Sequence, residues 1–173
     1  YQCFNLAIVV IPDSVVSIGD KAFNKCSALR ELTIGALVQT IGHSAFDRCS
    51  ALKAVTLPDT VKSIGKGVFS KCTALKPVVI GESLLSVPDY TFDGCSSLES
   101  LTLRASIKTI GNSAFRKTSL STITLPESMT SIGNNAFQGS RIVSVYIPDS
   151  VTIIGVNAFQ ECGRLKSVVI PDR

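Results

Sequence analysis

The chain has 173 residues, of which 45% are hydrophobic and 17% are charged, and its 17 basic and 13 acidic side chains give a net charge of +4. This hydrophobic fraction is enough to bury a substantial core, and the small net charge does not favour a nucleic-acid-binding protein. The longest uninterrupted apolar run, from Leu6 to Ile11, is far shorter than the roughly 18 residues of a membrane-spanning helix, so no membrane span is expected.

A single phenylalanine recurs along the chain at intervals of 22 or 23 residues. Around it the same text returns, I-P-[DE]-[ST]-V-x-x-I-G-x-x-A-F-x-x-C-x-x-L-x-x-[VL]-x-I. This periodicity predicts one array over residues 1-173, with about seven repeats and with both ends falling within repeats. The recurring residues are Phe23, Phe46, Phe69, Phe92, Phe115, Phe137 and Phe159.

The first element of each repeat is expected to be a short strand. Segments such as Leu29 to Ile34 read L-x-x-[LV]-x-[IL], and their last three positions alternate as in a half-buried strand. A proline or glycine follows directly, as at Pro58 and Gly81, and proline cannot donate to a strand ladder. We therefore expect strands that end after about six residues.

A corner and a return segment are expected next. The text V-x-x-I-G, as at Val15 to Gly19, predicts a turn in which the glycine supplies backbone freedom. Ala22, Phe23 and Cys26 then stand at i, i+1 and i+4, which places Ala22 and Cys26 on one face of a short helical turn. The return is therefore predicted to be short and helical or irregular.

Stacking of the repeats would bury the apolar side that no single repeat can bury. Strands about 4.8 Å apart would form a continuous parallel sheet over a core of leucine, isoleucine and phenylalanine columns. Because helical returns are wider than strands, the sheet is expected on the concave side of a horseshoe and the returns on its convex side.

From Cys3 to Asp172 the repeat text resembles the BspA-like, or treponemal-type, leucine-rich repeats. The resemblance implies a leucine-rich repeat solenoid of the α/β horseshoe kind. It also implies protein binding, because similar proteins act as surface or secreted adhesins of bacteria and protists. A cell-surface or extracellular location is favoured by this resemblance, with an intracellular assembly as the alternative.

The cysteines form one column and not a set of metal or disulfide pairs. Stacked Cβ atoms would be about 4.8 Å apart, beyond the roughly 3.5 to 4.5 Å of a disulfide. We expect reduced, buried thiols that hydrogen-bond nearby backbone, with disulfides as the alternative. Zinc is disfavoured because no C-x-x-C pair exists. The column comprises Cys3, Cys26, Cys49, Cys72, Cys95 and Cys162.

No catalytic arrangement is recognisable in the sequence. His43 is the only histidine, and it belongs to a mostly polar column typical of a solvated turn, so a Ser-His-Asp or Cys-His site lacks a base. Phosphate-binding loops and dinucleotide fingerprints are also missing. We expect neither enzymatic activity nor a cofactor.

An acidic column follows the proline position. Neighbours such as Asp59 and Glu82 could hold calcium, whereas Pro-Asp-Ser more commonly forms a turn in which Asp or Ser bonds local backbone. The sequence alone does not decide between a calcium site and a turn. The column comprises Asp13, Asp59, Glu82, Glu127, Asp149 and Asp172.

Basic residues gather in two columns of the N-terminal half and form a candidate patch for an anionic partner. A solvated face is the simpler alternative, and the lack of interleaved aromatic residues argues against nucleic acid. One column contains Lys25, Arg48 and Lys71, and the other contains Arg30, Lys53 and Lys76.

The outward strand positions of the C-terminal half form the candidate surface for a protein partner. All six are uncharged, and five of them are small. The sixth, Tyr146, offers a rigid ring with a hydroxyl group and could act as an anchor for a partner. The candidate residues are Ser100, Thr102, Thr122, Thr124, Ser144 and Tyr146. We expect a protein-binding module that acts as an adhesive or surface interaction domain or, alternatively, as a scaffold or linker subunit of a larger assembly. Uncapped edge strands would favour end-to-end association or further repeats.

Overall fold

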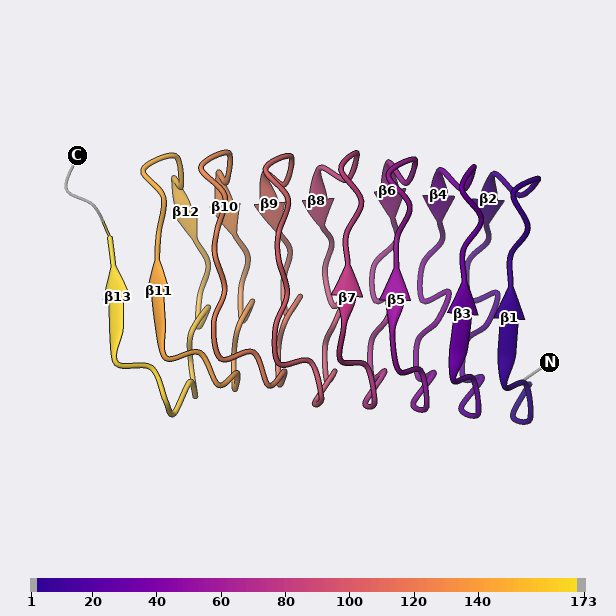
Figure 1. The fold of residues 1–173 in the computed structure, drawn as a ribbon. Coiled ribbons are helices and arrows are strands. Elements are labelled where there is room, and N and C mark those ends of the chain that lie inside the picture. Colours follow the sequence, from indigo (N-terminus) through magenta and orange to yellow (C-terminus); the bar gives the residue numbers. More distant parts are fainter. Residues whose placement is uncertain (1–2, 171–173) are drawn as a thin grey trace.

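The chain winds into a solenoid of stacked coils, each of which contains one of the seven recurring phenylalanines (Figure 1). The computed structural model describes residues 3–170. We number the coils one to seven, from the coil of Phe23 to the coil of Phe159. The predicted array of repeats with parallel strands is confirmed, and it places every repeat against its neighbours in the sequence.

The predicted strands form the first of two rows, at the front of Figure 1. Strand β1 pairs in parallel with β3 so that Val9 lies opposite Leu32, a shift of one repeat. The strands are two or three residues long, shorter than predicted. Coils five and six continue the row over 101–103 and 123–125 with the same alternation of buried and exposed residues. The first row comprises β1 (Ile8–Val10), β3 (Glu31–Thr33), β5 (Val55–Thr56), β7 (Val78–Val79), β11 (Ser144–Tyr146) and β13 (Ser167–Val169).

A second row of parallel strands occupies the place where a corner was expected. In the text V-x-x-I-G the two residues before the glycine form a strand, with Ser17 outward and Ile18 buried. The corner instead follows the first row, at the Pro-Asp-Ser segment (Figure 1). The second row comprises β2 (Ser17–Ile18), β4 (Thr40–Ile41), β6 (Ser63–Ile64), β8 (Ser86–Val87), β9 (Thr109–Ile110), β10 (Ser131–Ile132) and β12 (Ile153–Ile154).

The glycine column after the second row allows neighbouring coils to approach closely, which differs from the predicted turn. A Cβ atom on Gly133 would lie 2.6 Å from the carbonyl carbon of Gly111 and 2.7 Å from the amide nitrogen of Asn112, in the preceding coil. At Gly19, in the first coil, a Cβ atom would meet nothing within 4 Å. The preceding coil therefore excludes a side chain at Gly133, whereas it does not at Gly19.

One proline interrupts the second row between coils three and four. In most coils the amide of the column glycine donates to a carbonyl of the preceding coil, as from Gly65 to Ile41 at 2.7 Å and from Gly111 to Val87 at 2.8 Å. Pro88 occupies this position in coil four and has no N–H. Strand β6 is accordingly not paired with β8, and the row divides into β2-β4-β6 and β8-β9-β10-β12.

The return segments contain no helix within residues 3–170, so the helical form of the prediction is wrong and the irregular form is correct. The amides of Lys21, Phe23 and Lys25 donate to carbonyls of the next coil and not to their own turn. Lys21 and Lys25 also have positive φ angles, 55° and 61°, which no α-helix contains. The return is therefore a series of turns hydrogen-bonded from coil to coil.

The core is a ladder of phenylalanine rings flanked by aliphatic columns. Successive rings lie 5.3 to 5.8 Å apart between centroids and within 12° of parallel. The five inner rings are fully buried, whereas Phe23 and Phe159 at the two ends are partly buried. The prediction that the recurring phenylalanines form the core is therefore confirmed.

Candidate interaction surfaces

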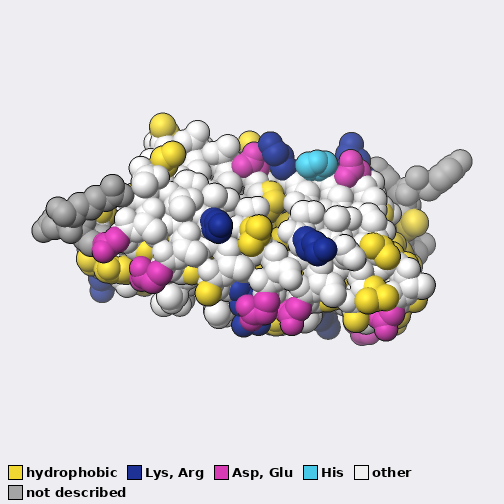
Figure 2. Space-filling model, turned by 90° about the horizontal axis from the view of Figure 1, so that it is seen from above, with side chains coloured by type: hydrophobic (Ala, Val, Ile, Leu, Met, Phe, Trp, Pro, Cys, Tyr) yellow, Lys and Arg dark blue, Asp and Glu magenta, His cyan; other side chains and the backbone are white. Residues whose placement is uncertain are grey.

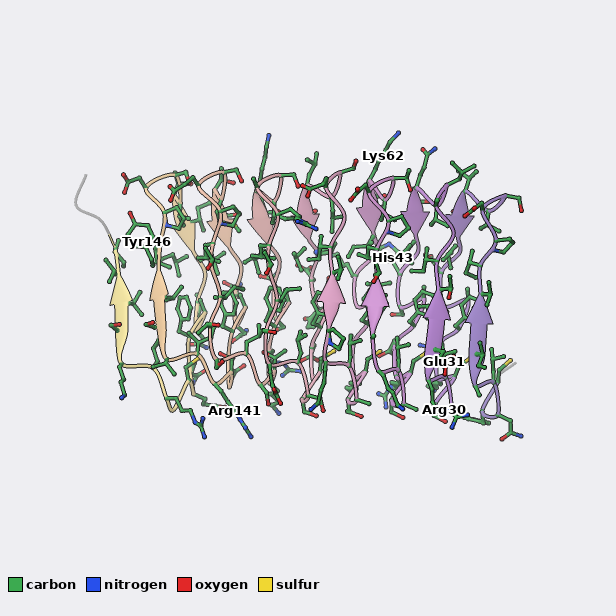
Figure 3. All side chains as sticks on the ribbon, viewed as in Figure 1. Arg30, Glu31, His43, Lys62, Arg141 and Tyr146 are labelled. Carbon is green, nitrogen blue, oxygen red and sulfur yellow. The ribbon has the colours of Figure 1, made fainter. Side chains whose placement is uncertain are left out.

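The six partner-binding candidates all lie exposed on the outward side of the first row, which we call the strand face. Their inward neighbours, such as Leu101 and Ile123, are buried and hold the row against the core. Tyr146 is 50% exposed on β11 (Figure 3), opposite Val169 of β13, which is exposed to the same extent. The structure thus places these hydroxyl side chains on one face of adjacent coils.

A shallow depression on the strand face includes one of these candidates and one residue that the sequence analysis missed. Thr102 lines a depression of about 230 Å³ together with Val79 and Arg104. Arg104 donates from Nε to the carbonyl oxygen of Ile80 at 2.8 Å, and its Nη1 lies 3.2 Å from Oε1 of Glu82. The signal that could have identified Arg104 is its place in the column otherwise held by proline or glycine.

The structure separates the two basic columns into different depressions. Lys25, Arg48 and Lys71 line a depression of about 350 Å³ together with Phe4, which is 55% exposed and which the sequence analysis did not connect with them. All three basic residues have positive φ angles near 60°. Phe4 is therefore an exposed aromatic neighbour of this column.

The second basic column lies at the lower corner of the coils, ahead of the first row, where Figure 3 labels Arg30. Lys53 and Lys76 line a depression of about 440 Å³ over Ala54 and Pro77. Lys76 also lies 3.8 Å from Glu99, an exposed contact that solvent screens strongly. The six basic residues do not form a single continuous pocket.

The acidic column lies at the opposite corner, and Figure 2 shows acidic side chains at both the upper and the lower margin of that view. Asp59 accepts a hydrogen bond at Oδ1 from the amide of Glu82 at 3.0 Å, and Asp13 accepts one from the amide of Ala36 at 2.6 Å. Within residues 3–170 no group of three acidic, histidine or cysteine side chains has the geometry to hold a metal ion. Asp172 lies outside the described residues.

The column of His43 has a structural role between coils. Nδ1 of His43 accepts a hydrogen bond from the amide of Lys66 at 2.9 Å, and Oδ1 of Asp20 accepts one from the amide of His43 at 2.6 Å. Asp89 and Asn112 form the same contact with the coils that follow them, both at 2.8 Å. Each of these short acceptor side chains therefore bonds the corresponding amide one coil later.

Ion pairs join coils on the return side. Arg116 binds the buried carboxylate of Asp93 through two hydrogen bonds of 2.8 and 3.0 Å, and hydrogen bonding to Asp93 raises the pKa of Arg116. Nζ of Lys66 lies 3.0 Å from Asp89. Burial opposes ionisation of Asp89, but hydrogen bonds from Lys66 and from the amide of Asn112 lower the pKa of this carboxyl overall.

The cysteine column is buried from Cys26 onward and bonds backbone of the preceding coil. The Sγ atoms of Cys49, Cys72 and Cys95 donate to carbonyl oxygens of phenylalanines at 3.1 to 3.2 Å. Burial raises the pKa of Cys49 and Cys95 to about 12, and burial likewise raises the pKa of Cys72 well above its usual value. Thiols of this kind are poor nucleophiles.

Comparisons with known proteins agree with this architecture. A model of the BspA type leucine-rich repeat region, in six copies, matches residues 1–96 and 85–173. No curated protein matches the chain. The described part of the chain has no helix long and apolar enough to cross a membrane.

Solved structures of bacterial repeat proteins are similar over nearly the whole chain. A leucine-rich cell surface protein of Faecalibacterium prausnitzii is 33% identical with a TM-score of 0.88, and the match covers 95% of this chain but only 47% of that protein. The Treponema pallidum leucine-rich repeat protein is 33% identical with a TM-score of 0.86, over 92% of this chain and 78% of the other. The pneumococcal vaccine antigen PcpA shares the fold at 23% identity and a TM-score of 0.71, over 95% of this chain and 51% of its own.

Proposed function

Because the chain belongs to the BspA-type leucine-rich repeat family, we propose that it is a non-enzymatic, protein-binding module whose strand face contacts the partner. We further propose that the module acts at a cell surface. The similar protein of Faecalibacterium prausnitzii, which is described as a cell surface protein, supports this location. The chain spans about half the length of that protein.

The observation that carries the proposal is the chemistry of the strand face in the C-terminal half. Its outward residues, among them Thr102, Thr124 and Ser144, are exposed, small and uncharged. Such a surface can be desolvated at little energetic cost, and hydroxyl groups can bond a partner's backbone. Tyr146 adds a rigid ring with few rotatable bonds, which is the kind of side chain that dominates binding energy at interfaces.

The test compares two tyrosines of similar exposure on opposite sides of the solenoid. A partner captured from the native source by crosslinking is purified, and its affinity is measured for Tyr146→Ala and Tyr90→Ala. Tyr90 is 46% exposed and lies on the return side, so it is the matched control. We expect Tyr146→Ala to weaken binding by roughly 1 to 3 kcal/mol and the control to leave it unchanged. Equal affinities for all three proteins would exclude the strand face near Tyr146.

A second candidate surface is the basic patch, which would bind an anionic protein. Its support is the depression of about 440 Å³ that Lys53 and Lys76 line over Ala54 and Pro77. Charge reversal at Lys53 and Lys76 would then weaken binding more than Tyr146→Ala does, and added salt would reduce the affinity steeply. Affinity that is insensitive to both charge reversal and salt would exclude this surface.

The alternative role, a scaffold subunit of a larger assembly, is supported by the C-terminal end of the stack. Ile154, Val168 and Ile170 are 40%, 39% and 62% exposed, whereas their counterparts one coil earlier are almost fully buried. An adjoining coil or subunit would cover these side chains.

A further inference from the structure

The return side has a polar depression at coil three. Two neighbouring columns of the return segments both have their smallest side chain in this coil. The column that includes Ser44 and Tyr90 has glycine in coil three, at Gly67. The column that includes Asp47 and Asp93 has serine in coil three, at Ser70. The longer side chains of coils two and four therefore project on either side of a notch of about 270 Å³.

The space above Gly67 is open and lies between hydroxyl groups. A Cβ atom placed on Gly67 would have Oγ of Ser44 at 3.5 Å, Cβ of Ser70 at 3.8 Å and Cβ of Tyr90 at 4.0 Å as its nearest neighbours, all at ordinary contact distance. The glycine has a φ of 64°, and serine or asparagine occupies the same column with φ between 51° and 59° at Ser44, Ser113, Asn135 and Asn157. The notch is thus free of side chain although the backbone accepts one.

The hydroxyl of Ser70 lines the notch, and this residue is 9% exposed. Within residues 3–170 no fully buried side-chain nitrogen or oxygen lacks a hydrogen-bond partner, so the Ser70 hydroxyl is not an orphaned buried group. A ligand hydroxyl that enters the notch can bond it in place of water.

The rim of the notch carries both acceptors and donors of hydrogen bonds. The acceptors are Asp47 and Asp93, whose outer sides are held by Asn24 at 3.1 Å and by Arg116. The basic residues that line the notch are Lys66, Lys71 and Arg48. Nζ of Lys66 lies 3.0 Å from Asp89, and Nε of Arg48 lies 3.7 Å from Asp47, so both side chains also take part in ion pairs of the rim. An anion would approach two carboxylates here, and a cation would approach three basic groups, so neither is well matched.

Tyr90 supplies an aromatic surface beside these polar groups. Its ring is 46% exposed, and its backbone has a φ of 59°, within the range of 51° to 59° that the non-glycine residues of the column hold, Lys21 among them. The fold therefore repeats this backbone conformation from coil to coil, and in coil four it carries an aromatic side chain that lines the notch.

We propose that this notch binds a neutral polyhydroxylated ring, such as one pyranose unit of a glycan. Each sugar hydroxyl can donate to a carboxylate of Asp47 or Asp93 and accept from Lys71 or Arg48, which uses the mixed rim in a way that a simple ion cannot. The C–H face of the pyranose would pack on the ring of Tyr90. The site lies on the return side, so the proposal is independent of binding at the strand face.

The test uses methyl β-D-glucopyranoside, methyl α-D-mannopyranoside and N-acetylglucosamine as neutral probes, with inorganic sulfate and glucuronate as anionic probes. Binding is measured by saturation-transfer and heteronuclear NMR on the whole chain. For a ligand of this size we expect a neutral sugar to bind with a Kd of about 1 mM. The amide signals that shift should be those of Gly67, Ser70 and Tyr90.

Three asparagine variants in one column provide the comparison. Asparagine is native to this column at positions 135 and 157, so each variant is expected to fold, which urea unfolding verifies. Gly67→Asn fills the notch and should abolish sugar binding. Tyr90→Asn removes the ring and should weaken binding about three- to tenfold. Ser113→Asn changes the next coil, outside the notch, and should leave binding unchanged.

Two results would overturn the proposal. The first is binding of sulfate or glucuronate without binding of any neutral sugar, which would make the notch an anion site. The second is an absence of neutral-sugar binding to the folded chain, or binding that Gly67→Asn leaves intact.

Discussion

Sγ of Cys72 lies 3.2 Å from the carbonyl oxygen of Phe46 in the preceding coil, so the thiol column and the phenylalanine column are joined by hydrogen bonds. The same contact recurs from Cys95 to Phe69 at 3.1 Å. Serine and threonine hold the position in coils five and six, where Thr118 bonds the carbonyl of its own coil at 2.9 Å. The position therefore requires a small donor, and it needs no reactive sulfur.

This contact predicts that the chain loses stability in alkali. Burial raises the pKa of Cys49 and Cys95 from 9.0 to about 12. Between these values the unfolded chain binds fewer protons than the folded chain, so the free energy of unfolding decreases as pH rises. The loss should reach about 1.4 kcal/mol per pH unit for each such cysteine and should be negligible below pH 9.

Urea unfolding at about pH 8 and about pH 10.5 measures this loss. The control replaces Cys49, Cys72 and Cys95 by serine, the residue that the column already contains at Ser140. The serine variant should have a much flatter pH dependence. If the two proteins lose the same stability, then other groups cause the alkaline effect.

The phenylalanine ladder predicts a large effect of truncation in the middle of the stack. Phe69 is fully buried between two parallel rings, so Phe69→Ala should lower the free energy of unfolding by about 3 to 5 kcal/mol. Phe159 has only one ring neighbour and is partly exposed, and Phe159→Ala should cost clearly less. Denaturant unfolding of both variants checks the order, and a loss below about 1 kcal/mol for Phe69→Ala would contradict burial of the ring.

The glycine column predicts opposite effects of the same substitution at two positions. Gly133→Ala forces a methyl group against backbone of coil five and should destabilise the chain by about 1 to 3 kcal/mol. Gly19→Ala meets open space and should be neutral or stabilising by up to about 1 kcal/mol, because alanine restricts the unfolded chain. Thermal and urea unfolding of the pair test the close-approach explanation, which equal effects would refute.

The exposed core columns at the C-terminal end predict self-association of the 173-residue chain. Ile154 and Val168 continue columns that are buried in the preceding coil, and among the strands of residues 3–170 β13 pairs with β11 alone. Sedimentation velocity should show concentration-dependent dimers or longer chains, and the double variant Ile154→Lys with Val168→Lys should reduce them. A sample that stays monomeric at high concentration would count against this prediction.

The repeat, the core columns and the outward residues of the first row could all be predicted from the sequence. These features depend on which positions of a repeat face the core. A position at which the same apolar residue recurs, as at Phe69 and its equivalents, is one that faces the core. The alternation of Ser17 and Ile18 also indicates the second row of strands, but the glycine that follows favours a turn when it is considered alone. This glycine allows close approach to the preceding coil, and the distance between two coils cannot be deduced from the sequence of a single repeat.

The form of the return segments could not be predicted for a related reason. An amide such as that of Phe23 can donate within its own turn or to the next coil, and the apolar pattern is the same in both cases. The positive φ angles at Lys25 and Arg48 occur in residues that do not usually signal a left-handed conformation. The notch at Gly67 and Ser70 likewise required two columns to be compared across three coils.

The missing N–H of Pro88 has a consequence for how the array loses its structure. In a linear stack each coil is stabilised only by its neighbours, so the weakest interface sets the boundary between cooperative units. Between coils three and four the second row lacks its ladder bond, while the first row keeps the pairing of β5 with β7 and the return side keeps bonds such as that from Phe69 to Thr91 at 3.0 Å. Partial melting should therefore leave two blocks, with amide hydrogen exchange fastest along the β6 side of this boundary. The solenoid would behave as two folding units joined in series.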